Sequence, residues 1–93
     1  MSNETFFLQA WFSGRVQGVG FRYQTLQTAK EFEVRGEVEN LADGRVLLQA
    51  EGEEAEVQSF LEAVQERMDN FIRDTETRTT HRPAQYHGFV ITS

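Results

Sequence analysis

The sequence predicts an α+β fold of the ferredoxin-like, split βαβ kind, a sandwich in which two helices cover one face of an antiparallel sheet. Two stretches with helical spacing alternate with apolar, strand-like stretches, which gives the order βαββαβ together with one extra short strand. An Asp-Gly pair between the two middle strands marks a tight hairpin. The 93 residues contain no composition break or repeat, so we expect one domain over residues 1–93.

The first strand is expected at residues 6–13, where apolar residues are nearly continuous. Successive side chains of a strand point to opposite faces of the sheet. The side chains expected to point inward, under the helices, are Leu8, Ala10 and Phe12. Phe7 and Trp11 then face the other side. The preceding residues, 1–5, are polar, and we expect them to be disordered.

A first helix is expected over residues 22–32, because apolar or small side chains recur every three or four positions from Phe21 to Phe32. It should end near Glu33. A half-buried strand follows at residues 34–40, where valine and glycine alternate with charged residues.

The Leu41–Gly44 connection is expected to be a hairpin, because Asp-Gly supplies the positive φ that such turns need. The return strand covers residues 46–50 and should end in an acidic turn from Glu51 to Glu54. The second helix is expected at 54–68, where apolar residues follow an i, i+3, i+4, i+7 pattern and the first turn is acidic.

The C-terminal part of the sequence is less regular. Residues 69–85 are polar and contain the only proline of the chain, and the extra short strand is expected within them at 75–80. The last strand is expected at 85–92, with Phe89 and Ile91 on one of its faces.

Composition limits the classes of function that fit the chain. The net charge of −6 disfavours nonspecific nucleic-acid binding, because the phosphate backbone would be repelled. There is no cysteine to form disulfides or thiolate metal sites. No window approaches the ~20 apolar residues of a membrane span. We therefore expect a soluble, cytoplasmic monomer without membrane or nucleic-acid partners.

The stretch from Gly14 to Arg22 joins the first strand to the first helix and contains three glycines and two arginines. Glycines let neighbouring backbone N–H groups converge, a helix N-terminus adds free donors, and arginine offers a planar fork for an anion. The stretch matches neither the Walker nor the dinucleotide pattern. It can therefore be read as a phosphate cradle or as a plain structural turn.

Asn40 is a polar residue at the end of the 34–40 strand, on the same face as the inward valines. In the predicted topology that strand end and the Gly14–Arg22 stretch lie at one end of the sheet, roughly 10 Å apart. Asn40 could then point toward the cradle. Alternatively, its side chain could bond to the backbone of its own turn.

Together, the residues from Gly14 to Arg22 and the later stretch Val38–Val46 resemble the acylphosphatases. That family combines a glycine-bounded V-Q-G-V-x-F-R loop with a V-x-N-x-x-D-G-x-V segment, and the resemblance extends over most of the chain. It implies that Arg22 binds the substrate phosphate together with the loop amides and that Asn40 holds the attacking water. The loop residues concerned are Val16, Gln17, Gly18, Val19, Gly20 and Phe21.

The function implied is metal-independent hydrolysis of a small-molecule acyl phosphate to a carboxylate and inorganic phosphate, with no cofactor. The leaving carboxylate is already a stable anion, so positioning and charge stabilisation can suffice. Neither motif contains a general base, and His81 and His87 are expected at the surface. Arg15 could raise the local positive potential or pair with an acidic neighbour, and we expect the second.

The chain departs from the family pattern at Glu33, where a glycine usually ends the first helix, and at Glu37, where a tryptophan is common. It also ends without the basic or aromatic residues often found there. These departures bear on stability and substrate range more than on the proposed chemistry.

Two other functions are compatible with parts of the sequence. The first is a regulatory or binding module that keeps the phosphate cradle without catalysis, since similar domains occur within larger carbamoyl-transferring enzymes. The second is a single-stranded RNA binder that presents Phe7 and Trp11 on the open face of the sheet, although the acidic net charge argues against it.

Overall fold

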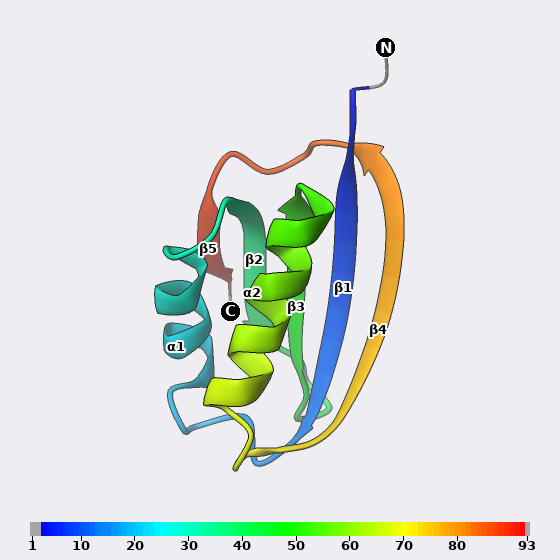
Figure 1. Ribbon diagram of the computed structural model, residues 1–93. Coiled ribbons are helices and arrows are strands. Elements are labelled where there is room, and N and C mark those ends of the chain that lie inside the picture. The colour runs from blue at the N-terminus through cyan, green and yellow to red at the C-terminus, as the bar shows by residue number, and fades with distance from the viewer. Residues whose placement is uncertain (1–2, 93) are drawn as a thin grey trace.

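The computed structural model describes residues 3–92 as one sheet with two helices packed on the same face (Figure 1). The elements, in chain order, are β1 (Glu4–Gly14), α1 (Phe21–Ala29), β2 (Val34–Asn40), β3 (Val46–Gly52), α2 (Glu54–Arg67), β4 (Ile72–Pro83) and β5 (Phe89–Thr92). The predicted positions of both helices and of the first three strands are therefore confirmed to within a few residues.

The sheet has the strand order β4-β1-β3-β2-β5, in which the first four strands pair antiparallel. The predicted ferredoxin-like class is confirmed, but β5 pairs parallel to β2, so the sheet is mixed rather than wholly antiparallel. The cause is visible in Figure 1: the chain after β4 crosses one end of the sheet and brings β5 to the opposite edge.

The sequence predicted a short extra strand at 75–80 and the last strand of the βαββαβ unit at 85–92, and the structure reverses these two assignments. The fourth strand of the βαββαβ unit is β4, whose 12 residues pair with β1 along its whole length, and the extra short strand is β5. Most β4 side chains are exposed, because it is an edge strand with neither face covered by a helix. Its stability comes from backbone pairing, which leaves no apolar alternation in the sequence.

The core lies between the sheet and the two helices. The side chains that were expected to point inward from β1 are buried, as are the apolar faces of β2, β3 and α2. The largest fully buried apolar side chains are Phe12, Phe21, Phe60, Leu8 and Leu48. Each contributes about 1.5–3 kcal/mol of hydrophobic stabilisation, which is what holds both helices against one face.

Helix α1 is shorter than predicted, because it ends at Ala29. The chain then continues in a tighter turn, in which the N–H groups of Lys30, Glu31 and Phe32 donate to carbonyls three residues earlier. This turn extends the helical spacing seen in the sequence, and it lets Phe32 pack against the core.

The disorder expected for residues 1–5 is corrected at Glu4 and Thr5. Strand β1 begins at Glu4, and the Thr5 hydroxyl donates to the Gly52 carbonyl at 2.8 Å, so these residues are ordered by pairing. Residues 1 and 2 lie outside the described part of the chain. Phe7 does face away from the helices, but it is only 4% exposed because the Arg82 guanidinium covers its ring at 3.4 Å.

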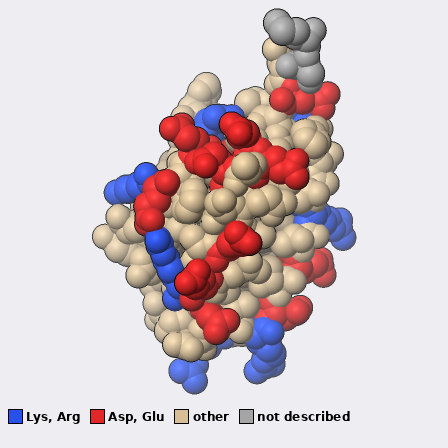
Figure 2. Space-filling model, viewed as in Figure 1, with Lys and Arg blue, Asp and Glu red and all other residues tan. Residues whose placement is uncertain are grey.

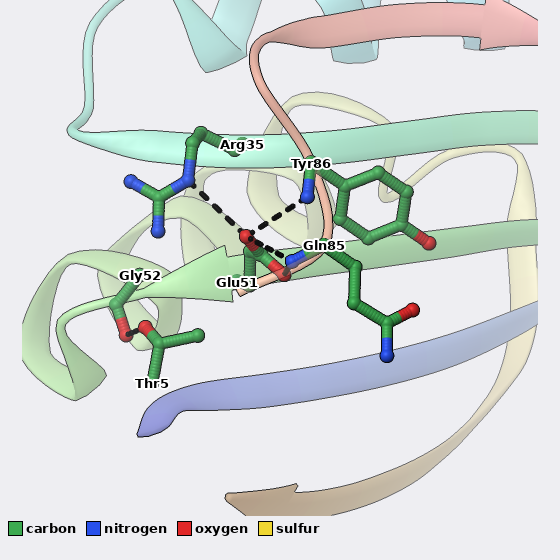
Figure 3. Close-up of polar contacts among 6 residues, drawn as sticks. All are labelled: Thr5, Arg35, Glu51, Gly52, Gln85 and Tyr86. Carbon is green, nitrogen blue, oxygen red and sulfur yellow. Dashed lines mark hydrogen bonds and ion pairs between the residues drawn. The ribbon is translucent and has the colours of Figure 1, made fainter. Parts of the chain in front are cut away.

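The predicted acidic turn after β3 is also different. Glu51 lies within β3, and its side chain is fully buried (Figure 3). Its carboxylate accepts hydrogen bonds from Arg35 Nε at 3.2 Å and from the backbone N–H groups of Gln85 and Tyr86 at 3.0 and 3.2 Å. We call these four residues the Glu51 clasp, because they fasten the connection between β4 and β5 to the middle of the sheet.

Candidate active site

The connection between β1 and α1 is built to present backbone N–H groups. Gly18 and Gly20 both have φ of +79°, in the left-handed region where a side chain costs about 1 kcal/mol. Gly20 is the N-cap of α1, and no side chain caps the helix. Among the described residues, no backbone hydrogen bond outside the helices and strands is donated by the N–H groups of 16–20. These donors and the helix N-terminus favour an anion.

The side chain of Gln17 braces this loop against the hairpin between β2 and β3. Its Nε2 donates to the carbonyl oxygens of Leu41 at 2.9 Å and of Arg45 at 3.0 Å. Because the hairpin starts directly after Asn40, the brace sets the distance between the loop and that asparagine. The sequence identified Gln17 only as a loop residue, since nothing in the pattern reveals acceptors 24 and 28 positions further on.

A cleft of about 200 Å³ lies at the N-terminal end of α1. It brings Arg22 from the first turn of α1 together with Asn40 from the end of β2. Its other lining residues are Val16, Gly18, Gly20, Phe21, Tyr23 and Ile91. Of the predicted loop residues, Gln17 and Val19 do not line it, because Gln17 is the brace and Val19 packs against the core. Tyr23 and Ile91 were not predicted as site residues.

Neither key side chain is satisfied by its neighbours. Arg22 is half-buried, and it forms no ion pair with any described carboxylate. The Asn40 Oδ1 atom is buried and accepts no hydrogen bond from the described residues. The hairpin is instead closed by backbone hydrogen bonds from the Leu41 N–H to the Arg45 carbonyl and from the Gly44 N–H to the Leu41 carbonyl, and by the Asp43 carboxylate, which accepts from the Arg45 N–H. The Asn40 amide oxygen thus does not cap its own turn, and the described residues leave it without a partner.

The sequence and the fold both match a known family. Residues 8–91 match the family model described as Acylphosphatase. The chain belongs to the acylphosphatase family. A relative named acylphosphatase from Lactiplantibacillus plantarum is 42% identical over 83 residues, which cover 87% of this chain and 91% of the relative. The resemblance predicted from the two sequence motifs is therefore confirmed.

Solved structures agree with this assignment. The crystal structure of acylphosphatase from Bacillus subtilis matches with a TM-score of 0.84 and 35% identity, covering 95% of this chain and 99% of that one. Full-length HypF in its phosphate- and nucleotide-bound form matches with a TM-score of 0.76 and 25% identity. That match covers 97% of this chain but only 12% of HypF, so the acylphosphatase fold also occurs as one part of a longer protein.

Charge is unevenly distributed on this acylphosphatase-family chain. Figure 2 shows acidic side chains gathered over the upper part of the helical face, whereas the lowermost charged side chains, at the end where the loop follows β1, are basic. Arg15 is exposed and forms no ion pair with a described residue, so the predicted acidic partner is wrong. The acidic protein thus has a locally positive end, as a phosphate site requires.

The remaining candidates lie away from the cleft. His81 and His87 are exposed, as predicted, and neither lines the cleft. Glu37, one of the departures from the family pattern, accepts hydrogen bonds from Tyr86 Oη at 3.0 Å and Thr92 Oγ1 at 3.1 Å.

The described residues contain no group of three His, Cys, Asp or Glu side chains that could hold a metal. Nor do they form a helix with the length and apolar character needed to cross a membrane.

Proposed function

We propose that this protein hydrolyses acyl phosphates to a carboxylate and inorganic phosphate, without a metal or other cofactor. The observation that carries the proposal is the shared cleft of Arg22 and the buried, unpaired Asn40 amide oxygen at the N-terminus of α1. Membership of the family supports a small-molecule acyl phosphate as the substrate. Inorganic phosphate as product and inhibitor, a monomeric state and a cytoplasmic location, without nucleic-acid partners, belong to the same proposal.

Arg22 and the loop amides bind the phosphoryl group. The guanidinium donates to phosphoryl oxygens, and the N–H groups from Val16 to Phe21 donate to the others at the positive end of α1. As the bond to the leaving group lengthens, charge redistributes over these oxygens, and donors fixed in advance stabilise it without reorganising.

Asn40 orients the nucleophile. Its amide oxygen accepts a hydrogen bond from a water molecule and aims the water oxygen at phosphorus. The new P–O bond forms as the bond between phosphorus and the acyl oxygen breaks, and the carboxylate leaves with the electron pair. The proton of the attacking water passes to a phosphate oxygen of the substrate. A carboxylate is a stable anion, so its departure needs neither an acid nor a Lewis acid.

The experiment is an ultraviolet assay of benzoyl phosphate hydrolysis by the full chain, by Arg22→Lys and by Arg15→Lys. We expect Arg22→Lys to lose nearly all turnover, because an ammonium cannot reproduce bidentate contacts to phosphate. Arg15→Lys is the matched control, since Arg15 lies in the same loop but outside the cleft, and it should keep wild-type activity. Activity should also persist in EDTA. Near-normal turnover by Arg22→Lys would refute the role of Arg22.

A second candidate is a phosphate-binding module without catalysis. The observation in its favour is the match to a small part of HypF, in which the fold is one portion of a longer chain. The two functions differ in one measurement. Phosphate binding that depends on Arg22, without hydrolysis of any acyl phosphate, would favour the module.

A further inference from the structure

The mouth of the cleft carries apolar side chains that phosphate binding does not require. Tyr23 is 61% exposed and Ile91 is 38% exposed, and both line the cleft. The third large hydrophobic side chain exposed among residues 3–92 is Val90, which lies outside the cleft. Two of three exposed apolar side chains therefore border the same small opening.

The two side chains flank the opening from different elements. Tyr23 follows Arg22 in the first turn of α1. Ile91 lies in β5, in parallel register with Val38 of β2, two positions before Asn40. Because α1 and β5 are in contact, the aromatic ring and the branched aliphatic side chain form two walls of one cleft.

The geometry of the displacement indicates that the acyl group of the substrate lies beside Tyr23 and Ile91. In an in-line displacement the water and the leaving group lie on opposite sides of phosphorus. Asn40 lines the cleft and its amide oxygen is enclosed by protein, so we assign the water that it orients to the inner side of the cleft. The leaving carboxylate must then point to the open side, where Tyr23 and Ile91 are the exposed apolar groups.

We propose that Tyr23 and Ile91 form an acyl subsite that favours acyl phosphates with aromatic or bulky apolar acyl groups over small ones such as acetyl or carbamoyl. The inference rests on the proposed function, because it assigns the substrate class of the same cleft. An acyl group held between a ring and an aliphatic side chain removes apolar surface from water. Both walls remain partly exposed. We therefore expect the two side chains to change the ratio of kcat/KM values between bulky and small acyl phosphates by about three- to tenfold, near the low end of what an apolar pocket gives.

The test compares kcat/KM for benzoyl phosphate with kcat/KM for acetyl phosphate in each protein. Dividing this ratio in a variant by the wild-type ratio cancels the intrinsic reactivity of the two substrates. Tyr23→Ala and Ile91→Ala should each lower the ratio about three- to tenfold, because the loss falls mainly on benzoyl phosphate. Tyr23→Phe should keep the wild-type ratio, because it retains the ring.

Val90→Ala is the matched control, since Val90 is the exposed neighbour of Ile91 in β5 and lies outside the cleft. Its ratio should equal that of the wild type. The inhibition constant for inorganic phosphate provides a second readout, and we expect it to be unchanged in Tyr23→Ala because Arg22 still binds the anion. An unchanged constant with a lowered ratio supports the acyl subsite.

Three outcomes would overturn the subsite. If Tyr23→Ala and Ile91→Ala keep the wild-type ratio while acetyl phosphate is hydrolysed, the subsite is wrong and the proposed function stands. If Tyr23→Ala loses both substrates equally and binds phosphate more weakly, Tyr23 positions Arg22 and does not contact the acyl group. If the wild type hydrolyses neither substrate, the proposed function and the subsite are both wrong.

Discussion

Asn40 holds a buried amide oxygen that accepts no hydrogen bond from any described residue, at the point where β2 ends. A buried acceptor without a partner costs about 1–3 kcal/mol, so its presence is unfavourable for stability alone. The proposed role of Asn40 in orienting a water molecule would give this cost a functional reason.

We therefore expect Asn40→Ala to lower kcat by ~10²-fold or more, as for the loss of one preorganised polar group. The inhibition constant for inorganic phosphate should stay near the wild-type value, because Arg22 and the loop amides remain. The melting temperature should not fall, since the variant removes an unpaired buried oxygen. Steady-state kinetics and thermal unfolding of the same preparation check all three, and an unchanged kcat would exclude Asn40 from the mechanism.

At this scale the sequence could predict Arg22 and Asn40 but not the residues around them. Two motifs with fixed spacing on recognisable elements led to both side chains, and the structure brings them into one cleft. Tyr23 resembles any exposed helix residue in the sequence, and Ile91 resembles any strand residue. Their position at the mouth depends on how β5 is placed beside β2, which the sequence pattern does not reveal.

The loop between β1 and α1 and the hairpin between β2 and β3 act as one unit at the scale of elements, because the Gln17 side chain donates to two hairpin carbonyls. Gln17→Met keeps the length and volume of the side chain but removes both donors. We expect it to lower kcat/KM about tenfold by loosening the loop relative to Asn40, since small misplacements of catalytic groups are costly.

The same variant should lower the free energy of unfolding by about 1–2 kcal/mol, the usual worth of two neutral hydrogen bonds. Activity assays and urea unfolding measure the two effects. Gln24→Met is a suitable control, because Gln24 is exposed on α1 and donates no side-chain hydrogen bond to the described residues. Wild-type kcat/KM in Gln17→Met would show that the brace does not set the geometry of the site.

The elements that the sequence predicted well are those with one buried face. Helix α2 and strands β1, β2 and β3 each have one face toward the core. Apolar residues therefore recur along them at the spacing typical of a helix or a strand. Strand β4 has no such spacing of apolar residues, because its side chains are largely exposed and its backbone pairs with β1 whatever the side-chain pattern. Exposed edge strands escape prediction for this reason.

At the scale of the whole molecule, the Glu51 clasp joins the C-terminal segment to the sheet (Figure 3). Burial by itself raises the pKa of Glu51, but hydrogen bonds from the Gln85 and Tyr86 backbones and from Arg35 outweigh it. The pKa of Glu51 in the folded protein is therefore below its ordinary value of 4.5. The ionised carboxylate is the form that holds β5, and with it Ile91, against β2.

Glu51→Gln should lower the free energy of unfolding by about 2 kcal/mol at pH 7, because a neutral amide replaces a charged acceptor and turns an N–H group toward existing donors. A carboxyl whose folded pKa is depressed stabilises the fold fully above its unfolded pKa, and this stabilisation is lost as the pH falls through the folded pKa. The difference between wild type and Glu51→Gln in the free energy of unfolding should thus be largest above about pH 5.5 and shrink as the pH falls below the ordinary carboxyl pKa of 4.5. Urea unfolding from pH 3 to 7 measures it, with the exposed Glu53→Gln as control. A difference that stays constant over this range would mean that the shape of the side chain, and not its charge, holds the clasp together.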